Sequence, residues 1–199
     1  RQTVSHACSA EELRAWRSGT ESAGWVHMNA AGASPAPDSV HSAMVRHLEL
    51  EREIGGYAAA ARKVREGARD VHDALAQLLG CDASEIAIAQ SAQSAWALAF
   101  YSLNFSDSDC IFCFASEYAG NAVAFLQMQK RTGVKLEVLP MCANGVVDLD
   151  ALEGRLKEKR HIGRSLVALT HVQTDSSIVQ PAAEVGALAR AHGGRPTQR

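Results

Sequence analysis

The sequence of 199 residues lacks the features of several large protein classes. Its formal net charge is only −2, so charge points neither to a nucleic-acid partner nor to an anionic membrane. The longest apolar runs, such as residues 110–115, are far too short to span a bilayer. Five scattered cysteines argue against a disulfide framework and favour a reducing, cytoplasmic location. The first residue is Arg rather than Met, which leaves open a targeting segment upstream.

Several catalytic and metal-binding motifs are also missing. The sequence contains no G-x-S-x-G, no G-x-x-x-x-G-K-[ST], no G-x-G-x-x-G and no H-E-x-x-H. Cys110 and Cys113 have the spacing of a redox or zinc pair, but they fall inside a predicted strand. Strand positions three apart face opposite sides, so we expect two buried, inert thiols and no metal site. His171, at a predicted strand end, stays a candidate site residue beside the alternative of a structural histidine.

What the sequence does contain is a regular alternation of strands and helices. Apolar segments predict strands at residues 86–89, 109–115, 134–139 and 165–170, and helices follow them at 94–103, 120–132, 148–159 and 181–192. Solidly apolar strands alternating with helices predict an α/β fold with a mainly parallel sheet covered on both faces. Two N-terminal helices precede it, at 37–53 and 58–79, separated by a break at 55–57 and closed by Gly80.

Ligand sites in such sheets lie beyond the carboxyl ends of the strands. Three predicted strand ends carry polar groups, at residues 90–94, 116–121 and 171–175. The first has a small-residue turn before a helix, which aims free N–H groups and a positive helix end at one point. Such a turn suits a phosphate monoester, although an ordinary connecting turn has the same appearance. Together the three ends suit a planar, phosphorylated, aromatic ligand.

In this order the strand ends resemble the class V aminotransferase family, which includes cysteine desulfurases and isopenicillin-N-epimerase-like proteins. The resemblance extends from about residue 26 to residue 192. It rests on Asn-Ala-Ala-Gly at 29–32, Gly-Gly-Tyr at 55–57, Ser-Ala-Gln-Ser-Ala-Trp at 91–96, Ser-Glu-Tyr-Ala-Gly-Asn at 116–121, and the spacing of 171–174 from 180–186. It implies pyridoxal 5′-phosphate as cofactor and an incomplete large domain of the aspartate-aminotransferase type.

The resemblance also assigns roles to individual residues. It implies that Ala92 and Gln93 lie at the cofactor phosphate, that Tyr118 stacks on the pyridine ring, and that Thr174 lies near the ring hydroxyl. The family often has Thr where this chain has Gln93, and Asn where it has Thr174. The substrate-entrance residues implied are Asn29, Ala30, Ala31 and Gly32.

The family continues beyond the last predicted helix with an Asp that pairs with the pyridinium nitrogen and a Lys that forms the Schiff base. Here residues 193–199 form a tail without family character, and no lysine stands in a family-like motif. We therefore expect a chain truncated before that lysine, with no catalytic residue of its own, weak or no cofactor binding and no amino-acid turnover. The lysines present are Lys63, Lys130, Lys135, Lys157 and Lys159.

The predicted organisation is an N-terminal segment with the entrance loop at 1–57, a partial cofactor-binding domain at 58–192, and the tail. For the family as a whole, the expected function is transamination, desulfuration or related chemistry on a small amino acid, by a homodimer. Two other hypotheses about function stay open. One is a non-catalytic α/β binding or scaffold fragment, and the other is an enzyme of unrelated chemistry that uses the same crevice.

Overall fold

The computed structural model describes residues 27–29, 32–66, 70–159 and 163–193. The chain divides into two compact units, Arg1–Ala87 and Ile88–Arg199. No helix among the described residues is long and apolar enough to cross a membrane.

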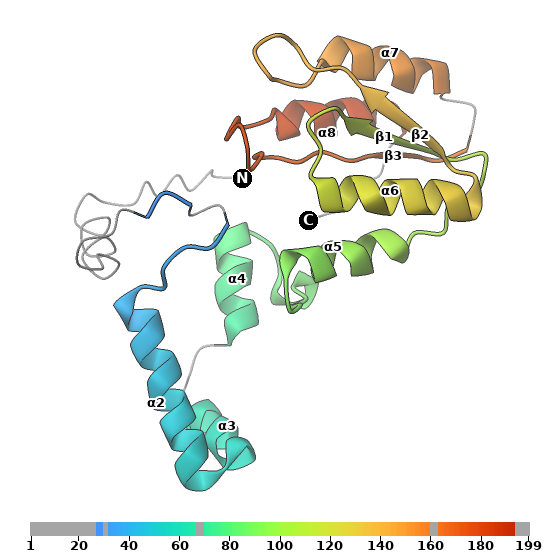
Figure 1. Cartoon of the computed structure of the whole chain (residues 1–199). Helices are drawn as coiled ribbons and strands as arrows, with labels where there is room; N and C mark the ends of the chain where they lie inside the picture. Colours follow the sequence, from blue (N-terminus) through green and yellow to red (C-terminus); the bar gives the residue numbers. More distant parts are fainter. Residues whose placement is uncertain (1–26, 30–31, 67–69, 160–162, 194–199) are drawn as a thin grey trace. The chain divides into compact units, whose positions relative to one another are not determined.

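The first unit consists of helices in its described part (Figure 1). They are α2 (Asp38–Ile54), α3 (Gly56–Arg65), α4 (Val71–Leu79) and the short 3₁₀ helix η1 (Ala83–Glu85). The predicted break is confirmed at Gly55, which takes a positive φ of 83° between α2 and α3, whereas Gly56 and Tyr57 already belong to α3. Gly80 closes α4 in the left-handed conformation, as the sequence predicts.

The prediction of a single helix at 58–79 is wrong. The segment contains two helices, because α3 ends at Arg65 and α4 begins at Val71. Asp70 caps the second of these helices, because its side chain accepts a hydrogen bond from the His72 backbone N–H. A short carboxylate competes for backbone N–H groups in this way and favours a helix start over a helix interior.

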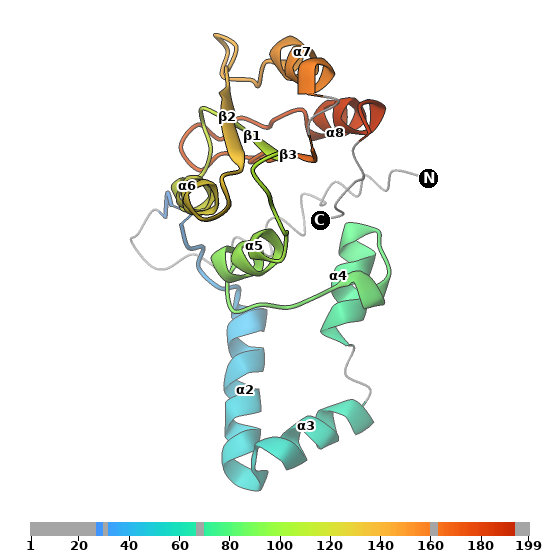
Figure 2. The ribbon, with the colours of Figure 1, turned by 90° about the vertical axis from the view of Figure 1, so that its right-hand side faces the viewer.

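The second unit is a three-layer α/β structure (Figures 1 and 2). Its parallel sheet has the order β2-β1-β3, formed by β1 (Cys110–Phe114), β2 (Lys135–Leu139) and β3 (Ser165–Val167). Helices α5 (Ala92–Tyr101) and α6 (Ala119–Thr132) pack on one face, and α7 (Leu149–Lys159) and α8 (Ala182–Ala191) on the other. The predicted α/β fold with a parallel sheet flanked by helices is confirmed.

The predicted strand at 86–89 is not part of this sheet. These residues form no strand, and the Ile88 side chain is 57% exposed. An apolar segment becomes a strand only when a neighbouring backbone offers it N–H and C=O partners. None of the strands in the described part of the chain pairs with it.

Strand β1 is buried along its whole length, and its side chains alternate between two cores. Ile111 and Cys113 face α5 and α6, whereas Cys110, Phe112 and Phe114 face α7 and α8. The two sulfurs therefore lie on opposite faces, as the spacing predicts. Burial, and then the charge of Glu117, raise the pKa of the Cys113 thiol to about 11. Among the described residues no three His, Cys, Asp or Glu side chains are grouped to hold a metal ion.

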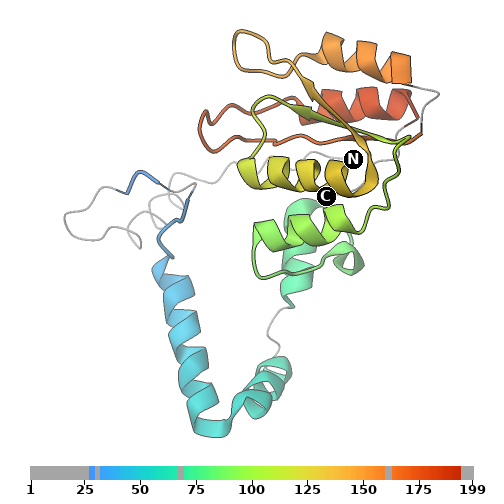
Figure 3. The same cartoon turned by 45° about the vertical axis from the view of Figure 1, so that its right-hand side comes forward.

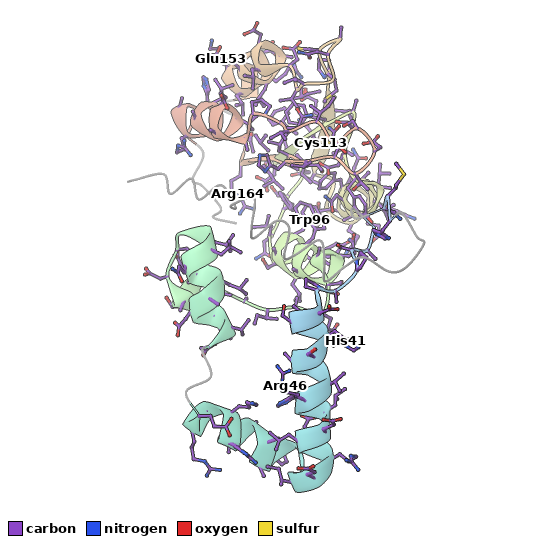
Figure 4. The ribbon with its side chains drawn as sticks, turned by 90° about the vertical axis from the view of Figure 1, so that its left-hand side faces the viewer. His41, Arg46, Trp96, Cys113, Glu153 and Arg164 are labelled. Atoms are coloured by element: carbon purple, nitrogen blue, oxygen red, sulfur yellow. The ribbon has the colours of Figure 1, made fainter. Side chains whose placement is uncertain are left out.

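An aromatic cluster holds α5 and α6 side by side under the sheet (Figure 3). Trp96, labelled in Figure 4, stacks on Phe100 with ring centroids 5.6 Å apart and meets Phe125 edge-on at 5.9 Å. Aromatic pairs of this kind contribute about 0.5–1.5 kcal/mol beyond the area they bury. The cluster therefore fixes the position of α5 against α6, and with it the relation between the starts of the two helices.

Asp109 connects the entry of β1 to the entry of β3. Its buried carboxylate accepts hydrogen bonds from the backbone N–H groups of Ser106 (2.8 Å) and Arg164 (2.7 Å), and from the Arg164 guanidinium (3.1 Å). Burial by itself raises the pKa of Asp109, but these hydrogen bonds outweigh it and lower the pKa from 3.8 to about 2. The folded unit therefore favours the ionised form.

Asp109→Asn should lower the free energy of unfolding at pH 7 by about 2 to 3 kcal/mol, which is the free energy equivalent of lowering the pKa from 3.8 to about 2. Because the folded pKa is the lower one, this contribution is complete above about pH 4 and disappears as the pH falls through 2. Urea unfolding at pH 7 and at pH 2.5 measures it. Asp107→Asn, at an exposed neighbouring position, is the matched control. Equal stability of Asp109→Asn and wild type at pH 7 would contradict the assignment.

Candidate functional site

The first turn of α5 presents backbone donors at the carboxyl edge of the sheet. Ser91 caps the helix, since its Oγ accepts a hydrogen bond from the Ser94 N–H at 3.1 Å. The N–H groups of Ala92 and Gln93 have no hydrogen-bond partner among the described residues. Free donors at a helix start, together with the positive end of the helix dipole, favour an anion.

The start of α6 meets the start of α5 at Gly120. A methyl group on Gly120 would lie 2.4 Å from Gln93 Oε1 and 3.0 Å from Tyr118 Cε1, both shorter than normal contacts. The Gln93 side chain and the Tyr118 ring therefore flank the same point, and a larger residue at position 120 would displace the end of the Gln93 side chain. Tyr118 is the N-cap residue of α6 and its side chain is 53% exposed, so the ring is available to a ligand.

Side-chain hydrogen bonds tie the loop at 116–121 to the loop that follows β3. Gln173 Nε2 donates to Ser116 Oγ, and Thr170 Oγ1 donates to Glu117 Oε1. Gln173 is buried, and its Oε1 accepts a hydrogen bond from Ser176 Oγ at 2.7 Å. Thr174 lies exposed in the turn next to Gln173. The structure thus brings Ala92, Gln93 and Tyr118 together and anchors the loop that carries Thr174 to the same edge.

The structure gives the backbone of His171 a hydrogen-bond partner and leaves its side chain exposed. Its side chain is exposed after β3, while its backbone carbonyl accepts a hydrogen bond from the Gln180 N–H at 2.8 Å. Gln180 is buried and clamps the turn at 145–147, accepting from the Val147 N–H and donating to the Gly145 carbonyl. The backbone of His171 therefore has a structural role.

The predicted entrance residues belong to the first unit. Asn29 Oδ1 accepts a hydrogen bond from the Gly32 N–H at 3.2 Å, and the Asn29 carbonyl accepts one from the Ala33 N–H at 3.1 Å. Asn29 and Gly32 are both exposed, and the Asn29 side chain stabilises the turn that they form. Ala30 and Ala31 lie outside the described residues.

The polar residues at 116–121 and 171–175 support the site through hydrogen bonds that the sequence alone does not reveal. Glu117 Oε1 accepts hydrogen bonds from the Tyr118 N–H (2.8 Å), from Asn121 Nδ2 (3.0 Å) and from Thr170 Oγ1. The available signal was a carboxylate placed soon after a wholly apolar strand, since a partly buried charge needs donors. Ser116 and Gln173 form the parallel link between the two loops.

These features fit a phosphorylated aromatic ligand such as pyridoxal phosphate. The free N–H groups of Ala92 and Gln93 suit the phosphate, and the exposed ring of Tyr118 suits a flat heterocycle. The missing side chain at Gly120 leaves room for the Gln93 side chain against the start of α6. The residues that meet there carry no charge, so the attraction for an anion comes from backbone dipoles.

Comparison with known proteins identifies relatives in sequence and in fold. The chain is 26% identical over 174 residues to the cysteine desulfurase IscS of Salmonella arizonae, which covers 84% of this chain and 42% of the relative. A cysteine desulfurase structure from Thermococcus onnurineus has a TM-score of 0.66 at 21% identity, covering 83% of this chain and 41% of that one. The cystine C-S lyase C-DES, in complex with its product cysteine persulfide, has a TM-score of 0.73 at 22% identity, covering 86% and 45%.

The chain therefore spans less than half the length of the relatives it matches, and the solved structures share its fold. The family model for class-V aminotransferases matches residues 26–195, which is most of the chain and includes both units in large part. The chain belongs to the class-V aminotransferase family.

Proposed function

We propose that the chain supplies the phosphate- and ring-binding edge of a pyridoxal-phosphate-dependent enzyme that acts on an amino acid. The observation that carries the proposal is the meeting of the Gln93 side chain and the Tyr118 ring at Gly120, where two helices begin. The reaction is transamination, desulfuration or a related change, and the cysteine desulfurases among the relatives favour a sulfur-containing amino acid. We further propose a cytoplasmic location and a homodimer for the whole protein.

Each proposed contact follows from the chemistry of the residue. The N–H groups of Ala92 and Gln93 bind phosphate oxygens, and the small side chain of Ala92 lets them approach. The Tyr118 ring stacks on the heterocycle and restricts its tilt. The Thr174 hydroxyl faces the ring hydroxyl, and Asn29 to Gly32 line the substrate entrance. When bound, pyridoxal phosphate supplies the electron sink for reactions at the amino-acid α-carbon, while these residues bind and orient it.

The lysines of the second unit lie away from this edge. Lys130 lies in the last turn of α6, about 15–20 Å along the helix from Tyr118. Lys135 begins β2, and Lys157 and Lys159 lie in the last turn of α7. These are all at the amino edge of the parallel sheet, opposite the ends that carry Tyr118 and Thr174. We propose that none of them binds the cofactor covalently.

The chain should bind pyridoxal phosphate weakly and without a covalent bond, with a Kd on the order of millimolar, because a few phosphate hydrogen bonds and one ring contact hold it. Titration followed by the ³¹P resonance of the ligand measures this. Tyr118→Ala should raise the Kd up to about tenfold, because one lost ring contact is equivalent to at most about 1.5 kcal/mol. Tyr57→Ala, which removes a ring that is 99% exposed on α3, is the control.

Treatment with borohydride and mass spectrometry should then find no lysine labelled in proportion to the protein. Stoichiometric labelling of one lysine, or equal affinities of Tyr118→Ala and wild type, would overturn the assignment of these residues. A wild-type chain that does not perturb the ³¹P resonance at all would favour a scaffold role.

Gly120→Ala tests the contact at the centre of the site. Alanine normally stabilises a helix by up to about 1 kcal/mol over glycine, and Gly154→Ala in α7, where the new methyl group meets nothing, should show that gain. At Gly120 the methyl group must displace the Gln93 side chain, so we expect little or no gain in the free energy of unfolding. Chemical denaturation and the NMR signals of the Gln93 side-chain amide measure the two effects. A gain equal to that of Gly154→Ala, with an unmoved Gln93 amide, would show that the contact does not exist.

A further inference from the structure

Glu117 receives three hydrogen bonds on one carboxylate oxygen. The donors to Oε1 are the Tyr118 backbone N–H at 2.8 Å, Asn121 Nδ2 at 3.0 Å, and the hydroxyl of Thr170. They come from three places, namely the N-cap of α6, its first turn and the loop after β3. Thr170 is 53 residues away along the chain, so a single oxygen joins two strand ends of the sheet.

The charge of this carboxylate lies at the start of α6, where the cap residue supplies no side-chain acceptor of its own. Tyr118 is the N-cap, and no side-chain hydrogen bond caps the helix. A tyrosine hydroxyl lies at the far end of a rigid ring and cannot reach its own backbone. Glu117 instead accepts the Tyr118 N–H directly, and a negative charge at a helix N-terminus is favourable.

The same bond determines where the Tyr118 ring lies. The Tyr118 backbone has φ −61° and ψ 132°, and the ring then passes within contact distance of the Gly120 position beside Gln93. Asn121, also held by Glu117, fixes the first turn of α6 on the other side of Gly120. Loss of the Glu117 carboxylate would therefore release both Tyr118 and Asn121.

We propose that Glu117 is the positioning residue of the Tyr118 ring, which it holds through the Tyr118 N–H, Asn121 and Thr170. The claim rests on the proposed function where it concerns pyridoxal phosphate, but the positioning of Tyr118 can be tested without any ligand. All three donors bind to one oxygen. A glutamine side chain keeps an acceptor oxygen at that place, so it should preserve part of the positioning.

The test uses the full chain and four variants, Glu117→Ala, Glu117→Gln, Thr170→Val and Glu184→Ala. Glu184 is an exposed acid in the first turn of α8 and controls for loss of a surface charge near a helix start. Hydrogen exchange of the Tyr118 amide, followed by NMR, reports on the positioning. The ³¹P titration with pyridoxal phosphate reports on the ligand, and thermal melting reports on overall stability.

Glu117→Ala should accelerate exchange of the Tyr118 amide by about tenfold or more relative to amides in β1, since a hydrogen bond to a charged acceptor is lost. Glu117→Gln should restore the rate to within about threefold of wild type, and Thr170→Val should give an intermediate rate. Pyridoxal phosphate should bind Glu117→Ala about fivefold more weakly, whereas Glu184→Ala changes neither exchange nor affinity.

An unchanged Tyr118 rate in Glu117→Ala would overturn the proposal. So would acceleration equal to that of the β1 amides, because that is general destabilisation. Failure of Glu117→Gln to slow exchange relative to Glu117→Ala would also count against it. If the wild-type chain does not bind pyridoxal phosphate, the proposed function fails, and the exchange rates alone decide whether Glu117 positions Tyr118.

Discussion

Burial of β1 on both faces is the constraint on which the rest of the second unit depends. All five of its side chains are at most 4% exposed, and they alternate between two cores. A strand of this kind must have a neighbour on each side and a helix layer on each face. Parallel neighbours in turn require crossovers, and the crossovers place the ends of β1, β2 and β3 at a common edge. The location of the site thus follows from the need to cover one apolar strand.

The same constraint explains why the site is built from neutral groups and a supporting carboxylate. The buried part of β1 ends at Phe114, and Ser116 and Glu117 follow within three residues in partly buried positions. Both polar side chains therefore need hydrogen-bond partners. Each finds its partner in the loop after β3, through Gln173 and Thr170 respectively. The two loops are therefore linked by consecutive residues, which leaves the first turns of α5 and α6 free to present N–H groups and an aromatic ring. Recognition of an anion by such backbone donors depends less on surface charge than recognition by lysines or arginines.

Local pattern predicted most of this fold, and non-local pairing accounts for what it missed. Helices such as α6 and α8 were predictable because periodicity and terminal residues specify them within a few positions. The segment at 86–89 has the composition of a strand. Whether such a segment pairs depends on backbone groups far away in the sequence, which a local pattern cannot predict. The start of α4 is capped by one side chain, Asp70, whose hydrogen bond a helical period does not reveal. Gln93 and Tyr118 were proposed as site residues from family resemblance. The hydrogen bond between Thr170 and Glu117 could not be predicted in the same way, because the two residues are 53 positions apart.

The placement of residues in two units also bears on how such an enzyme is put together. Ala92, Gln93, Tyr118 and Thr174 all belong to the second unit, whereas Asn29 and Gly32 belong to the first. On the proposed function, recognition of the cofactor is then a property of one unit, whose parts are fixed by the β1 core. The same proposal assigns the substrate entrance to the first unit, where the Asn29 side chain holds a turn of its own. We therefore propose that changes in the turn of Asn29 leave the contact at Gly120 undisturbed, because the two belong to separate units. This separation suits a family in which one cofactor-binding edge serves several reactions.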